Sequence, residues 1–250
     1  MTNAKLSEQL TNALKLTLAA VAVSFPADAP TDVARFEGVV PAGCVFWQHA
    51  MQRVFVTTAK DHALCSIGVH THHLANPVPA HPAELAEALK TMSELDYVRA
   101  DEVTAIPVIQ HENQYVMYGP LAEFPAEPEV VLLFANARQG LILSEALARV
   151  DQSAAPAMGR PACAAVPQAL NGGSAAMSLG CCGARAYLDI LTDSVNLWVL
   201  PGAKLERYCA EIASFARSNQ ILATFHTRRR EDVEAGQQPT VKQSLKRLSS

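Results

Sequence analysis

Cysteine is the residue of this chain most suited to metal or redox chemistry, and its placement repeats. Cys44 and Cys65 lie in the first half, about twenty residues apart, and Cys163 and Cys181 lie at a similar separation in the second half. In a cytoplasmic protein, such cysteines more often serve as metal ligands or redox thiols than as structural disulfides. We therefore predict that each half brings two thiolates to one shared site.

Four thiolates form the usual ligand set of an iron–sulfur cluster, and we expect the 4Fe–4S type. Glycines beside the cysteines would let backbone N–H groups approach the sulfur atoms: Gly43, Gly68, Gly180 and Gly183. The spacing is not the compact C-x-x-C pattern of ferredoxins or zinc ribbons. The alternatives are zinc binding, dithiol redox chemistry, or four small buried hydrophobic residues.

Two further cysteines have different expected roles. Cys182 follows Cys181 directly, and a disulfide between neighbours is strained, so one of the two is a ligand and the other a bystander. The sequence does not decide between them, and we take Cys181 as the ligand. Cys209 lies in an amphipathic segment and is expected in a hydrophobic core.

Histidines offer a second source of ligands. His70, His72 and His73 follow Cys65, and His70 and His72 would point the same way on a strand. This cluster favours a zinc or haem site, with a polar loop as the alternative. Separately, an Asp61-oriented His62 would be a general base for a Cys65 or Cys181 nucleophile, as in a thiol enzyme.

Two arginines flank the second cysteine pair. Arg160 and Arg185 would balance the negative charge of a cluster or hold a small anionic ligand. An iron–sulfur protein also implies a redox partner protein, and the activity would be that of an oxidoreductase or a lyase. The sequence does not indicate the substrate.

Hydrophobic periodicity predicts an α/β fold, with a layered mixed sheet and flanking helices. We expect strands at 18–25, 54–57, 104–110, 114–118, 129–135 and 196–200. We expect helices at 3–18, 44–52, 138–150, 163–170 and 204–217, with another that begins at 83–90. The strand at 114–118 is expected to stop at Gly119-Pro120.

The repeated order of strand, cysteine, cysteine and glycine suggests an internal duplication with two pseudo-symmetric halves. We divide the chain into a first half at 1–125, a second half at 126–225, and a polar tail at 226–250. The identities between the halves are few, so a single undivided α/β unit is the alternative.

The overall charge excludes some function classes. The net charge is −4, and Lys and Arg are not clustered as a nucleic-acid interface requires. The apolar run at 16–25 is about half as long as a membrane span and follows no typical signal sequence. We expect a cytoplasmic protein that does not bind nucleic acid or membranes and that can form a homo-oligomer.

Several short motifs resemble those of a known family. They are 118–121 (YGPL), 136–139 (NARQ), 159–167 (GRPACAAVP), 178–181 (SLGC) with Gly183 and Arg185, and 200–202 (LPG). With Cys44 and the segment 61–68, the chain resembles the DUF-169 (ArCR) family of prokaryotes from about residue 10 to 220. The resemblance implies a cytoplasmic α/β protein with cysteines recurring at the four ligand positions, and no agreed activity. His70, His72, His73 and Cys182 are not part of the family pattern.

Overall fold

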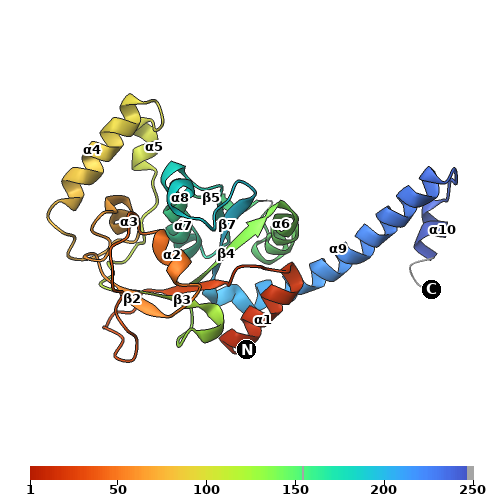
Figure 1. The fold of residues 1–250 in the computed structure, drawn as a ribbon, viewed down its shortest axis with the longest axis horizontal. Coiled ribbons are helices and arrows are strands. Elements are labelled where there is room, and N and C mark those ends of the chain that lie inside the picture. The colour runs from red at the N-terminus through yellow and green to blue at the C-terminus, as the bar shows by residue number, and fades with distance from the viewer. Residues whose placement is uncertain (154, 247–250) are drawn as a thin grey trace.

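The centre of the molecule is one mixed sheet with helices on both sides (Figure 1). The computed structural model describes residues 1–153 and 155–246. The sheet has seven strands in the order β2-β3-β1-β4-β7-β6-β5, and the β5–β6 pair alone is parallel among them. The strands are β1 (Val21–Ser24), β2 (Phe55–Thr57), β3 (Val116–Pro120), β4 (Val130–Asn136), β5 (Ala157–Met158), β6 (Ala176–Ser178) and β7 (Val195–Pro201). The predicted α/β class with a layered mixed sheet is confirmed.

Helices and short helical turns connect the strands. The α-helices are α1 (Asn3–Leu14), α2 (Val45–His49), α3 (Ser66–Thr71), α4 (His81–Glu94), α5 (Ala100–Thr104), α6 (Ala137–Asp151), α7 (Ala165–Gly172), α8 (Cys182–Tyr187), α9 (Leu205–Glu234) and α10 (Val241–Lys246). The 3₁₀ turns are η1 (Leu121–Glu123), η2 (Ala162–Ala164) and η3 (Gly202–Lys204). The predicted helices near 3–18, 44–52 and 163–170 are present with shorter or shifted bounds, and the one predicted at 138–150 is one residue longer at each end.

The two faces of the sheet bury different sets of side chains, because successive residues of a strand point to opposite sides. We call one the helical face. There Leu133 and its neighbours pack under α1, α6 and α9. We call the other the thiol face. There Leu132 and Tyr118 pack under residues of α2, α3, α7 and α8. Both leucines are fully buried, so the sheet is the middle layer of a three-layer fold.

Two strand predictions were wrong. The segment 104–110 forms the end of α5 and then a loop, in which Ile109 is buried singly and its N–H donates to the Thr71 carbonyl. The strand β3 does not stop at Gly119 but continues through Pro120. A Cβ at Gly119 would lie 2.7 Å from Val54 Cγ2. Glycine is therefore needed here because β3 passes close to Val54, and not because the chain turns.

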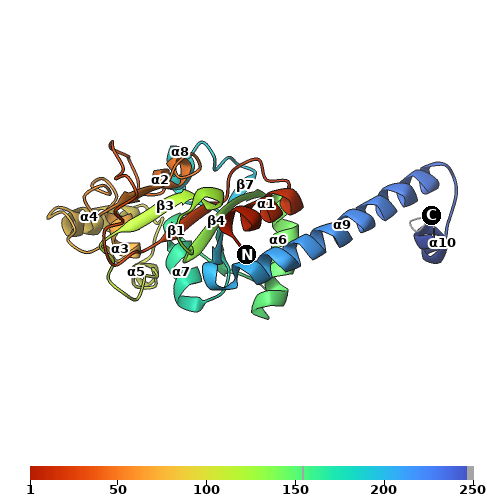
Figure 2. The same ribbon diagram turned by 90° about the horizontal axis from the view of Figure 1, so that it is seen from below.

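The helix predicted at 204–217 extends to Glu234, and its outer part leaves the body of the molecule (Figure 2). Beyond Phe215 it has few buried residues, among them Phe225. α10 packs back on this outer part. No helix of residues 1–153 and 155–246 has the length and hydrophobicity needed to cross a bilayer.

The two halves of the chain contribute strands in the same outward order. From the central β1–β4 pair, the first half places β3 and then β2, and the second half places β7 and then β6. Cys44 and Cys163 follow the central strands β1 and β4, and Cys65 and Cys181 precede β3 and β7. This order is the one that a duplication predicts, and the duplication itself stays a prediction.

Candidate functional site

The four cysteines predicted as ligands each lie at the start of a helical segment on the thiol face. Cys44 and Cys65 directly precede α2 and α3, and Cys181 caps α8. Cys163 lies in η2, which leads into α7. The first backbone N–H groups of a helix have no partner within the helix. Placement at a helix start therefore makes N–H groups available to the sulfur atoms.

Among these four thiols, ionised neighbours raise the pKa of Cys44, Cys65 and Cys163. Cys65 and Cys181 raise the pKa of Cys44, and Cys181 raises the pKa of Cys65. Cys65, Cys181 and Cys44 all raise the pKa of Cys163. Such interactions between thiols require proximity in a buried setting. The fold therefore brings sulfur atoms from both halves of the chain into one neighbourhood.

Burial keeps three of these thiols protonated. Cys65 and Cys163 are each 8 % exposed. Burial first, and neighbouring thiols second, raise the pKa of Cys44 to about 12 and the pKa of Cys163 well above its usual value. Burial also raises the pKa of Cys65. A soft metal ion or cluster binds thiolates, so its binding here would release protons.

Hydrogen-bond donors offset part of this burial. The N–H groups of Gly43 and Gly68 are directed at Cys65, and their effect is to lower its pKa. The N–H of Ala184 lies 3.5 Å from Cys181 Sγ, and the nearby Thr71 hydroxyl lowers the pKa of Cys163. Hydrogen bonds to sulfur are a recurrent feature of iron–sulfur sites, where they help to set the potential.

The four glycines expected at the site differ in how much space they have. A Cβ at Gly43 would lie 2.6 Å from His62 Nδ1, and a Cβ at Gly68 would lie 2.9 Å from Cys65 Sγ. Gly180 has φ +95°, a conformation that other residues rarely adopt. Gly183 lies within α8, where an added Cβ would make an ordinary contact at 3.6 Å. Close approach to the thiols therefore concerns Gly43 and Gly68.

The two arginines predicted beside the site make contacts with protein groups. Arg160 donates to the Tyr97 carbonyl, stacks on the Tyr97 ring at 4.7 Å and lies 3.7 Å from Glu102. Arg185 donates to the carbonyls of the loops around α8, at Leu179, Leu191, Thr192 and Val195. Arg185 thereby fixes the backbone on both sides of Cys181, and Arg160 holds the segment that follows α4.

His62 is a buried histidine beside Gly43 and Gly68, the two glycines that contact Cys65. Its Nε2 lies 3.3 Å from Thr57 Oγ1, and Thr57 donates to the Val116 carbonyl. Thr57 must therefore accept from Nε2–H, which leaves Nδ1 as a hydrogen-bond acceptor without a partner. Burial, and then the neighbouring His72 and His81, keep the pKa of His62 well below 6.5. The ring is neutral at pH 7.

The prediction that Asp61 orients His62 was wrong. Asp61 Oδ2 instead accepts from the Thr58 backbone at 2.7 Å, from the Thr58 hydroxyl at 2.9 Å, and from Arg35 at 3.1 Å. Adjacent residues in this tight turn point in different directions. The orienting group of His62 is a threonine hydroxyl from β2.

His70 and His72 would point the same way on a strand, but the structure places His70 in the helix α3 and His72 at its end. His70 is exposed, His73 has φ +49° and bonds to the Ile109 carbonyl, and only His72 is buried. His72 Nδ1 lies 2.9 Å from the Gly68 carbonyl, and its Nε2 has no partner. The three imidazoles therefore do not converge on one point.

Tyr118 is a site residue that the sequence analysis did not identify. It is fully buried, its hydroxyl has no partner, and it is coupled to Cys65, Cys163 and Cys44. Buried polar groups without partners are uncommon and often mark a missing ligand or water. A tyrosine in an otherwise apolar strand was the available signal, because its hydroxyl needs a partner when buried.

The remaining two cysteines are not among the four thiols that are linked by effects on pKa. Cys182 is exposed, and its N–H is bonded to the Tyr97 hydroxyl. Cys209 is buried on the helical face, with its sulfur 4.0 Å from the Leu6 carbonyl. All six cysteines are free thiols. Of the adjacent pair, Cys181 is the one coupled to the other three thiols.

Among the described residues, no group of three or more His, Cys, Asp or Glu side chains could hold a metal ion as the side chains stand. A single zinc ion needs its ligands within about 2.3 Å of one point. The thiols are neighbours, but they do not converge on such a point. This arrangement does not fit a single zinc ion without side-chain movement.

A family model described as "Uncharacterised ArCR" matches residues 9–211. The chain belongs to the DUF169 family. No curated protein and no solved structure matches it. The match includes the four neighbouring cysteines, His62 and Tyr118, so the whole site lies within the part that is typical of DUF169. The projecting end of α9 and α10 lie outside the matched residues.

Proposed function

We propose that this DUF169 protein binds an iron–sulfur cluster of the 4Fe–4S type through Cys44, Cys65, Cys163 and Cys181. The observation that carries this proposal is the proximity of four buried or half-buried thiols from both halves of the chain. The cluster would serve a redox reaction or a cluster-dependent enzymatic reaction, and a redox partner protein would then exchange electrons with it. The six free thiols favour the reducing conditions of the cytoplasm.

The geometry favours a cluster over a single ion. Around one zinc ion all ligand sulfurs lie at one short distance from a shared centre, and the described thiols do not converge in this way. In a cluster each thiolate binds a different iron atom, so the four sulfurs surround a larger volume. The unpartnered Tyr118 hydroxyl and His62 Nδ1 lie near these thiols. When bound, the cluster would supply one-electron chemistry or an open iron position for a substrate.

The protein's own residues have separate tasks in this proposal. The cysteines hold the iron atoms, and the N–H groups of Gly43 and Gly68 stabilise negative charge on Cys65. Arg185 fixes the loops that carry Cys181. The apolar surroundings of the thiol face exclude water, which strengthens each of these interactions.

Anaerobic reconstitution with ferrous iron, sulfide and a reductant tests the proposal. We expect a brown protein with broad visible absorption and about four iron and four acid-labile sulfide per chain. Protein that stays colourless and iron-free, with all its thiols still titratable, would contradict it. Zinc or haem binding, the alternatives from the sequence, would appear in the same experiment as bound zinc without colour or as a sharp Soret band.

A thiol enzyme is the second candidate, because His62 Nδ1 lies without a partner close to Cys65. A general base beside a thiol is one requirement of a cysteine nucleophile. The raised pKa of Cys65 acts against it, since the thiolate is the reactive form. Rapid alkylation of Cys65 at pH 7 in the metal-free protein would favour this candidate, and slow alkylation would count against it.

A further inference from the structure

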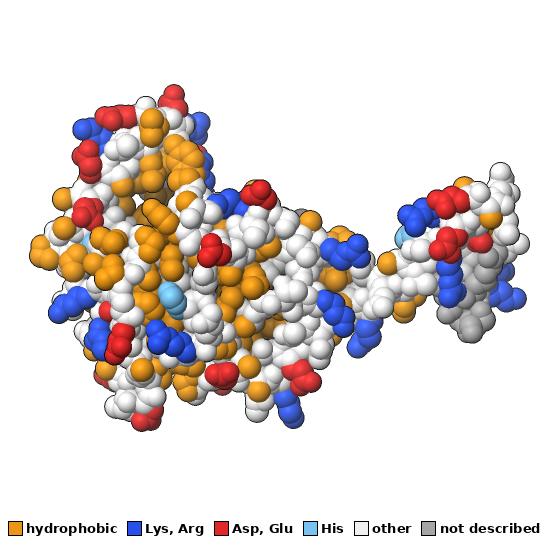
Figure 3. Space-filling model, in the orientation of Figure 1, with side chains coloured by type: hydrophobic (Ala, Val, Ile, Leu, Met, Phe, Trp, Pro, Cys, Tyr) orange, Lys and Arg blue, Asp and Glu red, His pale blue; other side chains and the backbone are white. Residues whose placement is uncertain are grey.

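A cleft of about 600 Å³ separates α4 from the body of the molecule next to α8. Figure 3 shows hydrophobic side chains on both sides of a hollow beside α4. The wall formed by α4 includes Ala88, Met92 and Leu95, and Cys182 forms part of the opposite wall. The volume is within the usual range for sites that bind small molecules.

The cleft stays open because α4 is held at both of its ends. At the first end, His81 is buried and its Nε2 lies 3.1 Å from the Ala63 carbonyl. At the second end, Tyr97 makes two hydrogen bonds. Its carbonyl accepts from Arg160, and its hydroxyl accepts from the Cys182 N–H at 3.3 Å. Between these attachments no residue of α4 is fully buried. The helix and the residues after it therefore present an apolar stripe that a ligand would cover, in which Ala88 and Met92 are half-buried and Leu95 is exposed.

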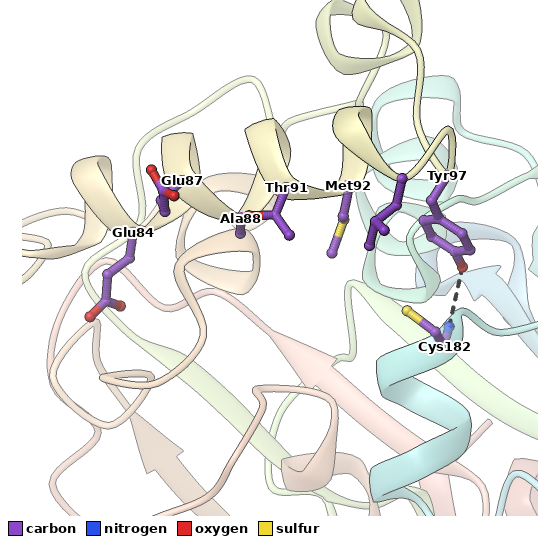
Figure 4. Close-up of a pocket in the computed structure, with 8 residues that line it drawn as sticks. Glu84, Glu87, Ala88, Thr91, Met92, Tyr97 and Cys182 are labelled. Atoms are coloured by element: carbon purple, nitrogen blue, oxygen red, sulfur yellow. Dashed lines mark hydrogen bonds between the residues drawn. The ribbon is translucent and has the colours of Figure 1, made fainter.

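The charged side chains that line the cleft indicate which charge a ligand would carry. Glu84 and Glu87 lie at one end, and neither carboxylate is in an ion pair in the described part of the chain. Lys and Arg are absent from the lining residues that the structure describes. Figure 4 shows Met92 and Tyr97 directed toward Cys182, away from this acidic end. The cleft thus joins an apolar floor to a region of negative charge.

We infer that this cleft binds a small hydrophobic cation, with its apolar part against Met92, Leu95 and Tyr97 and its charge toward Glu84 and Glu87. This charge is opposite to that of the anionic ligand expected from Arg160 and Arg185, which are engaged with protein groups. Cys182 follows Cys181, so the bound cation would lie beside the four thiols. The inference does not depend on the presence of a cluster.

Tetraphenylphosphonium is a suitable probe, and tetraphenylborate has the same shape with the opposite charge. In calorimetric titrations of the full-length, metal-free protein, we expect the cation to bind about tenfold more tightly than the anion. We also expect the bound cation to slow the alkylation of Cys182 by a maleimide, measured by peptide mass spectrometry. Equal or tighter binding of the anion would overturn the inference.

The double variant Glu84→Gln/Glu87→Gln removes both charges from exposed positions and should fold normally. Its affinity for the cation is expected to fall about fivefold, while Glu94→Gln, which is paired with Lys90 on the same helix, keeps the original affinity. Absence of binding, binding without protection of Cys182, or unchanged affinity in the double variant would each overturn the inference. Because these titrations use metal-free protein, they are independent of the iron assay.

Discussion

The two faces of the central sheet share the same strands but differ in how completely their polar groups are satisfied. On the helical face, Leu133 and Cys209 lie among apolar side chains of α1, α6 and α9, and Trp198 Nε1 is buried without a partner. On the thiol face, the Tyr118 hydroxyl and the His62 and Trp47 ring nitrogens Nδ1 and Nε1 are buried without partners. An unsatisfied buried group costs about 1–3 kcal/mol. The difference teaches that unpartnered polar atoms gather on the thiol face, beside the cysteines, which is where the proposed cluster would bind.

The same substitution on the two faces should have opposite consequences for iron binding. Cys163→Ser is expected to abolish the visible absorption of the reconstituted protein and to remove nearly all of its cluster iron. Cys209→Ser, an equally small change in a buried residue of the helical face, should retain about four iron per chain. Equal iron contents in the two variants would remove the distinction between the faces.

Adjacent leucines of β4 allow stability to be separated from function. Leu132 and Leu133 are both fully buried and point to the thiol and helical faces. Each change to alanine should lower the free energy of unfolding by about 2–5 kcal/mol in urea titrations. Only Leu132→Ala is expected to reduce cluster occupancy as well. A larger loss of iron in Leu133→Ala would contradict this assignment.

The buried His72 should make stability depend on pH. Burial lowers its pKa to about 4, whereas the unfolded value is about 6.5. Between these values the unfolded chain binds the extra proton, so the free energy of unfolding falls as the pH falls through this window. From pH 7 to pH 5, His72→Gln should lose about 1–2 kcal/mol less stability than the unaltered protein. Equal losses in urea titrations would show that His72 is not the source.

Tyr118→Phe tests whether the unpartnered hydroxyl is a cost in the absence of ligand. The metal-free variant should be about 1 kcal/mol more stable, because an unsatisfied buried hydroxyl is removed without a change of shape. This gain should be smaller once iron and sulfide are bound. A destabilised metal-free variant would mean that the hydroxyl already has a partner, such as an ordered water molecule.

Cys182→Ser should have the smallest effect. Its side chain is exposed and belongs to the cleft rather than to the four neighbouring thiols. We expect unchanged iron content and a change in stability within about 0.5 kcal/mol. Loss of the cluster in this variant, with retention in Cys181→Ser, would reverse the assignment within the adjacent pair.

Much of the fold was predictable from local patterns. The continuous apolar run at 130–135 and the period of four in α1 each depend on residues close in sequence, and both elements were predicted. The strand expected at 104–110 was wrong because a short apolar run does not distinguish a strand from a loop with one buried side chain. The outer part of α9 lacks an apolar period, so its helix was not predicted.

The sequence by itself determined the type of most long elements, the layered α/β class and the set of cysteines proposed as ligands, because these follow from residue type and local period. Only the tertiary structure decided that thiols from both halves become neighbours, that Thr57 rather than Asp61 orients His62, and that Cys182 faces a cleft. These relations depend on strand order and on side-chain direction. Both are set by contacts between residues far apart in the chain. Such contacts produce no periodic pattern in the local sequence from which they could be predicted.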